Sequence, residues 1–279
     1  MVDRLAIAGL GLIGGSIAIA VKNKYPNSKI VGITRNIESV RKNNFSKYFD
    51  LLLDYSELVE TRNIDFCVIC SPVSTIPEVF RTLKSYFGVR TIFTDVGSVK
   101  EWIVKEINDT SFIGSHPMAG SEKSGIENAD PNIFLNATCV VTPKNNSEEQ
   151  IKIVSEFWNN LDMNVILLSP EVHDKIVSQT SHLVHLVSFA LSKLLSQSEF
   201  SKDMFYGIFG KGLIDTTRVS KSDPHLWIDI FKRNKNNLID ALEDFISVIR
   251  TFRDYVKVEN WDTLLESLMK AKNFRDSIK

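Results

Sequence analysis

The first 168 residues alternate short apolar runs with longer stretches whose apolar residues recur at helical spacing. The short runs are continuous and bounded by turn residues, which is typical of buried strands. Because strands that alternate with helices indicate βαβ units, we predict a largely parallel sheet. The predicted strands are 4–8, 29–33, 66–70, 91–94, 111–114, 138–142 and 163–168, and the predicted helices are 13–24, 37–43, 74–86, 99–107 and 148–161.

The pattern changes at Pro170. Beyond it the sequence predicts no convincing strand, and apolar residues at helical spacing fill 170–198, 224–257 and 261–274. We therefore expect the second part of the chain to be all-helical. Some of these helices are long enough to form a surface shared with a second copy, so we expect a homodimer.

A glycine-rich loop, IAGLGLIGGS, follows the first predicted strand and leads into the first predicted helix. Gly9, Gly11 and Gly14 have the G-x-G-x-x-G spacing, which in this position predicts dinucleotide binding. Gly9 is needed for the tight turn, Gly11 for close approach of a pyrophosphate and Gly14 for packing of the helix on the strand. The backbone of Leu12 and Ile13 would then bind the pyrophosphate at the helix N-terminus. A glycine-rich turn without a ligand is the alternative.

The fold class that follows is α/β. We predict a Rossmann-type dinucleotide-binding domain over residues 1–168 and an all-helical substrate and dimerisation domain over residues 169–279. A dinucleotide implies a redox cofactor but names no substrate.

The second strand ends in VGITRN, where an acidic residue that binds the ribose of NAD would be expected. Thr34 and Arg35 occupy this position instead. A threonine can donate a hydrogen bond to a 2′-phosphate and an arginine can pair with it. We therefore predict that NADP is accepted and preferred. In the alternative, Arg35 is a solvated loop residue beside a neutral site that accepts NAD.

Polar residues follow three other predicted strands, at the sheet edge where ligands of open α/β sheets bind. Ser71 and Pro72 are expected beside the nicotinamide. Ser98 either faces the cleft or only caps the next helix, since Ser98 and Glu101 match a capping box. His116 lies between a strand and a loop rich in Gly and Ser, and a neutral imidazole there could take a proton from an alcohol as hydride leaves the same carbon; a hydrogen bond that orders the loop is the alternative.

The helical part adds two further candidates. His182 and His185 lie on one face of the helix in SQTSHLVHLVSFALSKLL and are expected to line a cleft for an anionic ligand, with hydrogen bonding between helices as the alternative. We predict no metal site, because no Asp, Glu or Cys set accompanies the two histidines. Arg218 lies in a segment between helices, where it could bind a carboxylate with both arms of its guanidinium. A surface salt bridge is the alternative for Arg218.

Composition restricts the location and the partners. The formal charge is -1, from 33 basic and 34 acidic residues, which gives no reason to expect nucleic acid or an anionic membrane as partner. No apolar run is long enough to span a bilayer and no signal peptide is evident, so we predict a cytoplasmic protein. Cys67 and Cys70 are expected to be small buried apolar residues rather than a disulfide or metal pair.

The motifs GLGLIGGS, DVGSVK, HPMAGSEKSG, TSHLVH and DTTRVSKSDPHLW occur in the same order as those of TyrA-type prephenate/arogenate dehydrogenases, which the chain resembles over nearly its whole length. The resemblance implies oxidative decarboxylation of prephenate to 4-hydroxyphenylpyruvate, or of arogenate to tyrosine. It leaves the choice between these two substrates open, and tyrosine feedback as well.

The resemblance also implies residue roles. His116 would bind the ring hydroxyl as catalytic base, with Ser98 helping to hold it. Ser121, His182, His185 and Arg218 would surround the small-molecule substrate, and Trp227 would close the pocket, within one chain or across the dimer. Two residues depart from the family pattern. Val184 replaces a proline between the two histidines, which removes a perturbation of the helix, and Lys211 replaces a glycine.

Two other functions are compatible with a Rossmann domain followed by helices. A β-hydroxyacid dehydrogenase or imine reductase would use a catalytic lysine, for which Lys175 is the candidate, although its neighbours do not fit. A non-catalytic nucleotide-sensing protein would be expected to have lost the polar strand ends, yet Ser98, His116 and Arg218 are all present.

Overall fold

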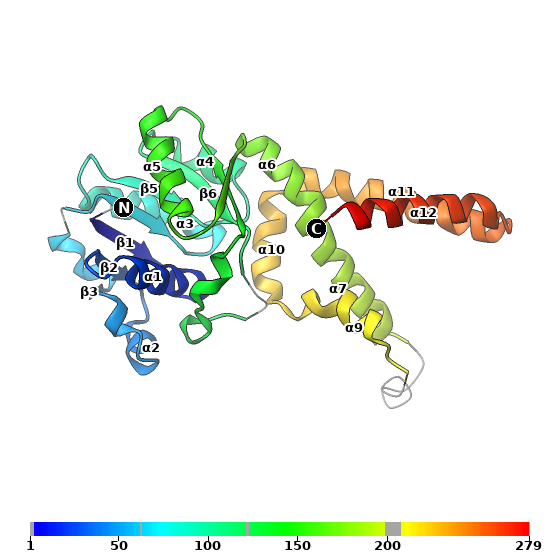
Figure 1. Ribbon diagram of the computed structural model, residues 1–279, viewed down its shortest axis with the longest axis horizontal. Helices are drawn as coiled ribbons and strands as arrows, with labels where there is room; N and C mark the ends of the chain where they lie inside the picture. Colours follow the sequence, from blue (N-terminus) through cyan, green and yellow to red (C-terminus); the bar gives the residue numbers. More distant parts are fainter. Residues whose placement is uncertain (1–2, 62, 121–122, 199–207, 279) are drawn as a thin grey trace. The chain divides into compact units, whose positions relative to one another are not determined.

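The computed structural model describes residues 3–278 other than 62, 121–122 and 199–207 (Figure 1). Its sheet has eight strands in the order β3-β2-β1-β4-β5-β6-β7-β8. Neighbouring strands are parallel except for β6 and β7, which are antiparallel. The strands are β1 Arg4–Ala8, β2 Lys29–Ile33, β3 Leu51–Leu53, β4 Phe66–Ile69, β5 Ile92–Asp95, β6 Phe112–Pro117, β7 Thr138–Thr142 and β8 Asn164–Leu167. The α/β prediction is confirmed, and β3 is an addition to it.

The helices follow the predicted pattern closely. In the sheet half they are α1 Leu12–Lys24, α2 Ile37–Lys42, α3 Ile76–Tyr86, α4 Glu101–Ile107 and α5 Glu148–Asn159. Beyond them come α6 Pro170–Val177, a π-helical turn Ser178–His182, α7 Leu183–Ser196, α9 Lys211–Thr217, α10 Pro224–Arg233, α11 Lys235–Lys257 and α12 Trp261–Ser277. No strand follows Pro170 in the described part of the chain, as predicted, whereas α9 was not predicted.

Apolar residues cover both faces of the sheet. One core joins the strands to α1 and α5 through residues such as Ile17 and Trp158. The other joins them to α3, α4 and α10 through residues such as Phe80, Ile103 and Trp227. Because α10 takes part in this second core, a helix from the second half of the sequence is held directly at the sheet.

Strand register brings the ends of the central strands to one edge. Ala8 at the end of β1 pairs with Ile33 of β2 on one side and with Ile69 of β4 on the other. Ile69 in turn pairs with Asp95 at the end of β5. The loops that follow these strands therefore emerge side by side, which is where an open α/β sheet binds its ligands.

Side chains at the helix starts confirm one sequence signal and contradict another. Asp223 accepts a hydrogen bond from the His225 backbone at the start of α10, as its position before Pro224 predicts. Ser147 and Gln150 form a capping box at α5. The capping box expected for Ser98 is wrong, because α4 starts at Glu101 and has no side-chain cap from its own loop.

Contacts divide the described chain into two compact units, one ending at Asn234 and one beginning at Lys235. The first contains the sheet and α6, α7, α9 and α10, and the second contains α11 and α12. The boundary predicted at residue 168 marks the change from sheet to helices and stays a prediction as a domain boundary. Among the described helices, none is both long and apolar enough to cross a membrane.

Candidate active site

The glycine loop has the shape that a dinucleotide needs. Gly9 has a φ of 101°, and a Cβ there would lie 2.5 Å from the carbonyl oxygen of Cys70. A Cβ on Gly14 would collide with the carbonyl oxygen of Gly9, whereas a Cβ on Gly11 would meet no described atom within 4 Å. Gly11 is the residue before α1, so its open backbone and those of Leu12 and Ile13 fit a pyrophosphate.

Thr34 and Arg35 lie at the end of β2, as predicted. Thr34 is buried, and its hydroxyl oxygen accepts a hydrogen bond from the Asn36 backbone at 3.2 Å, which leaves the hydroxyl hydrogen to be donated elsewhere. Arg35 is exposed. Burial raises the pKa of Tyr55 to about 12, and the charge of Arg35 opposes this shift.

Ser71 and Pro72 follow β4 beside the glycine loop. The Ser71 Oγ is buried and has no hydrogen-bond partner among the described residues. A buried hydroxyl without a partner costs free energy, so this atom fits a site that a cofactor completes. These residues together are compatible with the predicted nucleotide site.

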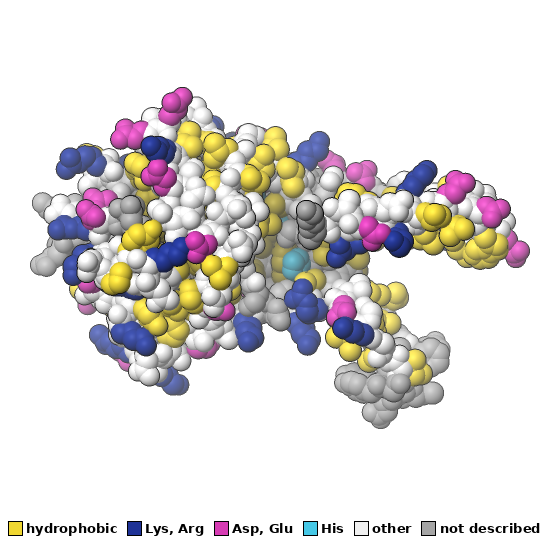
Figure 2. All heavy atoms as spheres, viewed as in Figure 1, with side chains coloured by type: hydrophobic (Ala, Val, Ile, Leu, Met, Phe, Trp, Pro, Cys, Tyr) yellow, Lys and Arg dark blue, Asp and Glu magenta, His cyan; other side chains and the backbone are white. Residues whose placement is uncertain are grey.

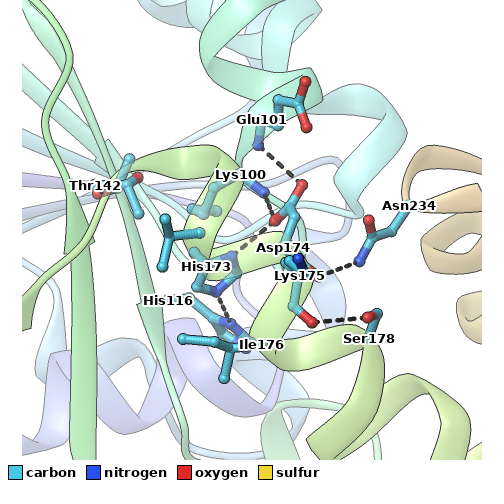
Figure 3. Close-up of polar contacts among 12 residues, drawn as sticks. Lys100, Glu101, His116, Thr142, His173, Asp174, Lys175, Ile176, Ser178 and Asn234 are labelled. Carbon is cyan, nitrogen blue, oxygen red and sulfur yellow. Dashed lines mark hydrogen bonds and ion pairs between the residues drawn. The ribbon is translucent and has the colours of Figure 1, made fainter. Parts of the chain in front are cut away.

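His116 lies near the end of β6, within the strand rather than in the loop where it was expected. Its Nδ1 is 2.9 Å from Nε2 of His173, and Nδ1 of His173 is 2.7 Å from Oδ1 of Asp174 (Figure 3). Both partners come from α6. Burial lowers the pKa of His116 well below its usual value, and His173 and Lys100 act in the same direction. His116 is therefore neutral near pH 7 and able to accept a proton.

A buried ion pair lies beneath His116. Lys100 contacts Asp95, and both side chains are fully buried. The Lys100 ammonium also donates to the carbonyl oxygen of Ser115 at 2.8 Å, and the Asp95 carboxylate accepts from the backbone of Ser115 and Gly97. Burial raises the pKa of Asp95 and lowers that of Lys100, and the contact between them opposes both shifts. The pair fixes the backbone immediately before His116.

A cavity of about 410 Å³ opens beside His116. Most of the predicted substrate residues line it. Its described lining is Ser98, His116, Pro117, Met118, Ala119, Gly120, Ser181, His185, Arg218, Val219, Ser222, Leu226, Trp227 and Ile230. The cavity therefore joins the carboxyl end of β6 to α7 and α10 and has the size of a small-molecule site.

Aromatic stacking shapes one wall of this cavity. His185 stacks on Trp227 with ring centroids 3.6 Å apart, and the Trp227 indole donates to the Ser222 hydroxyl at 2.8 Å. Burial lowers the pKa of His185, and Arg218 adds to this effect. Trp227 thus reaches the pocket of its own chain, and Arg218 brings a positive charge to it.

Several predicted residues lie elsewhere. His182 is fully buried and is absent from the described lining, with its Nδ1 at 3.2 Å from Nδ2 of Asn234. Ser121 lies outside the described residues. Lys211 is exposed at the start of α9. Lys175 is exposed on α6, so it does not suit the catalytic role considered for it.

The helix that carries the two histidines is perturbed although Val184 replaces the proline. The π-helical turn Ser178–His182 precedes α7, and Val184 points outward with about half of its surface exposed. The expectation of an unperturbed helix is therefore wrong. His185 follows in α7, with its Nδ1 3.0 Å from the carbonyl oxygen of Ser181.

Sequence reasoning missed four buried polar residues, Asp95, Lys100, His173 and Asp174. For His173 and Asp174 a signal was available, because they stand next to each other in EVHDK. The helix pattern alone, however, assigns neither of them a partner. Asp95 and Lys100 stand within DVGSVK, a motif that was noticed only for its serine.

Charged side chains of both signs are interspersed over the sheet domain (Figure 2), in agreement with the small net charge. On the α11–α12 hairpin, by contrast, apolar side chains gather on one side. The exposed ones include Val256, Trp261, Leu265, Leu268 and Met269.

Comparisons with known proteins agree over the whole chain. Residues 17–167 match the family described as prephenate dehydrogenase, nucleotide-binding domain, and residues 169–270 match prephenate dehydrogenase, dimerization domain. Prephenate dehydrogenase of Bacillus subtilis is 31% identical over 285 residues, which cover 100% of this chain and 76% of the relative.

Two solved structures are also similar. Prephenate dehydrogenase of A. aeolicus, in complex with hydroxyphenyl propionate and NAD+, has a TM-score of 0.92 and 32% identity, covering 100% of this chain and 99% of the other. Arogenate dehydrogenase of Synechocystis has a TM-score of 0.85 and 26% identity, covering 99% of this chain and 100% of the other.

Proposed function

Because this chain belongs to the prephenate dehydrogenase family, we propose that it catalyses the NAD(P)-dependent oxidative decarboxylation of prephenate or arogenate. One observation carries the proposal at the level of residues. His116, buried and neutral, opens onto a cavity that also holds Arg218, at the same sheet edge as the glycine loop.

The chemistry needs a proton acceptor at the ring hydroxyl. His116 takes the hydroxyl proton as hydride leaves the same ring carbon, and the bound nicotinamide supplies the acceptor for that hydride. The bond to the ring carboxylate then breaks, CO2 departs and the electron pair aromatises the ring. His116 returns its proton to the resulting phenolate oxygen, so the reaction releases no net proton.

The other lining residues bind and orient the substrate. Arg218 lines the cavity, and we propose that its guanidinium pairs with a carboxylate, which both candidate substrates carry. Ser98 lines the cavity together with His116 and can help to hold the hydroxyl. The stacked Trp227 and His185 form a largely apolar wall that excludes water from the reacting ring.

Turnover of prephenate and arogenate, each with NAD and with NADP, tests this function by the absorbance of reduced nicotinamide. The same matrix selects the substrate, since the two differ only in a keto or amino group on the side chain. His116→Asn is expected to lower kcat by about 100-fold or more. His225→Asn is the matched control, because His225 is exposed on α10 and not among the cavity residues. Undiminished turnover by His116→Asn would refute the assignment of the base.

We further propose that NADP is preferred. The proposal is supported by the hydroxyl of Thr34 and the exposed guanidinium of Arg35 at the end of β2, where G-x-G-x-x-G domains hold the adenine ribose. Arg35→Asp is expected to raise the KM for NADP about tenfold or more, with a much smaller effect on NAD. Arg41→Asp removes a neighbouring charge that already pairs with Glu38 and serves as control. An unchanged KM for NADP in Arg35→Asp would refute the preference.

We also propose a cytoplasmic homodimer. The match of residues 169–270 to a dimerization domain and the apolar side of the α11–α12 hairpin support the dimer. Light scattering of the purified chain would measure its mass. A mass of one chain at assay concentration would contradict the dimer.

A further inference from the structure

Three buried side chains form a line that ends at the cavity. His116 of β6 contacts His173 of α6, and His173 contacts Asp174, the next residue along the same helix (Figure 3). The relative exposure of His173 and Asp174 is 1% each, and that of His116 is 8%. The rings of His116 and His173 meet edge to face, 70° apart. This geometry leaves the Nε2 of His116 as the nitrogen that is not used in the line.

The protons along the line have one consistent arrangement. Asp174 accepts the backbone N–H groups of Lys100 at 2.8 Å and Glu101 at 3.0 Å, one on each carboxylate oxygen. An ionised carboxylate only accepts, so the Nδ1 of His173 must donate to it. The Nε2 of His173 then carries a lone pair and accepts from the Nδ1–H of His116. The Nε2 of His116 is left with a lone pair.

The opposite arrangement would disable the base. With the proton on Nε2, His116 would present a donor toward the substrate hydroxyl and could not remove its proton. The contacts of Asp174 oppose this tautomer. Its carboxylate accepts two backbone N–H groups from the start of α4 and therefore also accepts from His173, which fixes the tautomers of both histidines.

The same line also bears on the charge that forms during the reaction. Protonated His116 would be disfavoured by its surroundings, since burial lowers its pKa and His173, Lys100 and His182 lower it further. Two carboxylates belong to the same network of contacts: Asp95, which is paired with Lys100, and Asp174, which contacts His173. The ring of His173 lies between Asp174 and the imidazolium of His116. Through it the carboxylate could stabilise the positive charge, as the acid of a catalytic triad does by direct contact.

We propose that His173 and Asp174 are positioning residues for the dehydrogenase reaction. They hold His116 in the tautomer whose Nε2 is free of a proton, and Asp174 stabilises the imidazolium once the substrate proton has been taken. The proposal rests on the proposed function in one respect, namely that His116 is the base.

Nitrogen NMR of the full chain labelled with 15N-histidine tests the tautomer without any turnover. The expected spectrum of the wild-type protein shows His116 protonated on Nδ1 and bare on Nε2. In His173→Leu, which removes the acceptor, the Nε2-protonated form of His116 is expected to appear. A wild-type His116 protonated on Nε2 would overturn the proposal.

Kinetics of His173→Leu and Asp174→Asn test the consequence for catalysis. We expect kcat to fall by about 100-fold while the KM for substrate changes by less than about threefold, because neither His173 nor Asp174 is among the described residues that line the cavity. Retention of wild-type kcat by both variants would overturn the proposal.

Two measurements separate positioning from folding and from the proposed function. Glu171→Gln removes an exposed carboxylate from the same helix and is expected to keep the wild-type kcat. Unchanged binding of NADPH by the variants shows that they are folded, since the glycine loop is remote in sequence from α6. If the tautomer shifts as expected but the wild-type chain oxidises neither substrate, the proposed function fails while the positioning of His116 stands.

Discussion

The stability of the protein is expected to fall between pH 6.5 and pH 4 because of His182. This residue ends the π-helical turn before α7 and is fully buried. Burial lowers its pKa from 6.5 to about 4, although the negative charge of Asp174 opposes the shift. Neutral His182 is held near Asn234, and a proton added to it would bring a charge into the interior.

The sign of the effect follows from proton binding in the two states. Between pH 6.5 and about 4 the unfolded chain protonates this histidine and the folded chain does not, so acid favours unfolding. The contribution is fully present above pH 6.5 and is lost as the pH falls to about 4. A pKa change of this size corresponds to about 3 kcal/mol, a large part of the roughly 5–15 kcal/mol that stabilises a typical protein. The pKa values of His116 and His173 are lowered too, which adds to the loss.

Urea unfolding between pH 4.5 and pH 7.5 would measure this dependence. Each proton taken up only by the unfolded state gives a slope of about 1.4 kcal/mol per pH unit. His182→Asn removes the titrating group and keeps a polar side chain beside Asn234, so its slope is expected to be lower by about that amount near pH 5. His225→Asn, at an exposed position, should keep the wild-type slope. Equal slopes for wild type and His182→Asn would show that the reasoning is wrong.

Three other predictions concern the same machinery. Gly9→Ala is expected to weaken cofactor binding and to lower the melting temperature, because the φ of 101° and the nearby carbonyl leave no room for a Cβ; an unchanged Kd for NADPH would contradict this. Lys100→Met should cost about 3–5 kcal/mol in urea unfolding by leaving Asp95 buried without its partner, and adding Asp95→Asn should recover part of it; no loss in the single variant would refute the role of the pair. The acidic limb of the kcat/KM profile should lie below pH 6.5, since burial lowers the pKa of His116; a limb above that pH would argue against His116 as the base.

Local pattern was sufficient for most of the fold. The glycine loop, the continuous apolar runs and the change of pattern at Pro170 all depend on residues that are close in sequence. The strand β3 was missed because Leu51–Leu53 is only three residues long, and an edge strand of that length has no periodicity to detect. The helix α9 was missed because Lys211–Thr217 is short and rich in residues with weak helix preference.

Part of the candidate site was predictable from local position or from motifs. His116 was singled out because it follows a strand, Arg218 because it lies between helices, and Trp227 only through the family resemblance; all three line one cavity. His173 and Asp174 were not singled out, because their partners lie 57 residues and more away in sequence. An acid that caps the start of another helix leaves no trace in the pattern of its own helix.

Burial makes His116 a weak base, and the reaction nevertheless suits one. The neutral imidazole is present at any pH near 7 because its pKa is well below the usual value. The substrate hydroxyl is a poor acid at first, yet it becomes strongly acidic as hydride leaves its carbon and a carbonyl forms. A weak base can therefore take the proton at that stage. The phenolate formed on loss of CO2 has the basicity of tyrosine, with a pKa of about 10, so it readily takes the proton back. The buried site thus favours both proton transfers, provided that the lone pair of His116 faces the substrate, and that is the condition which His173 and Asp174 are placed to meet.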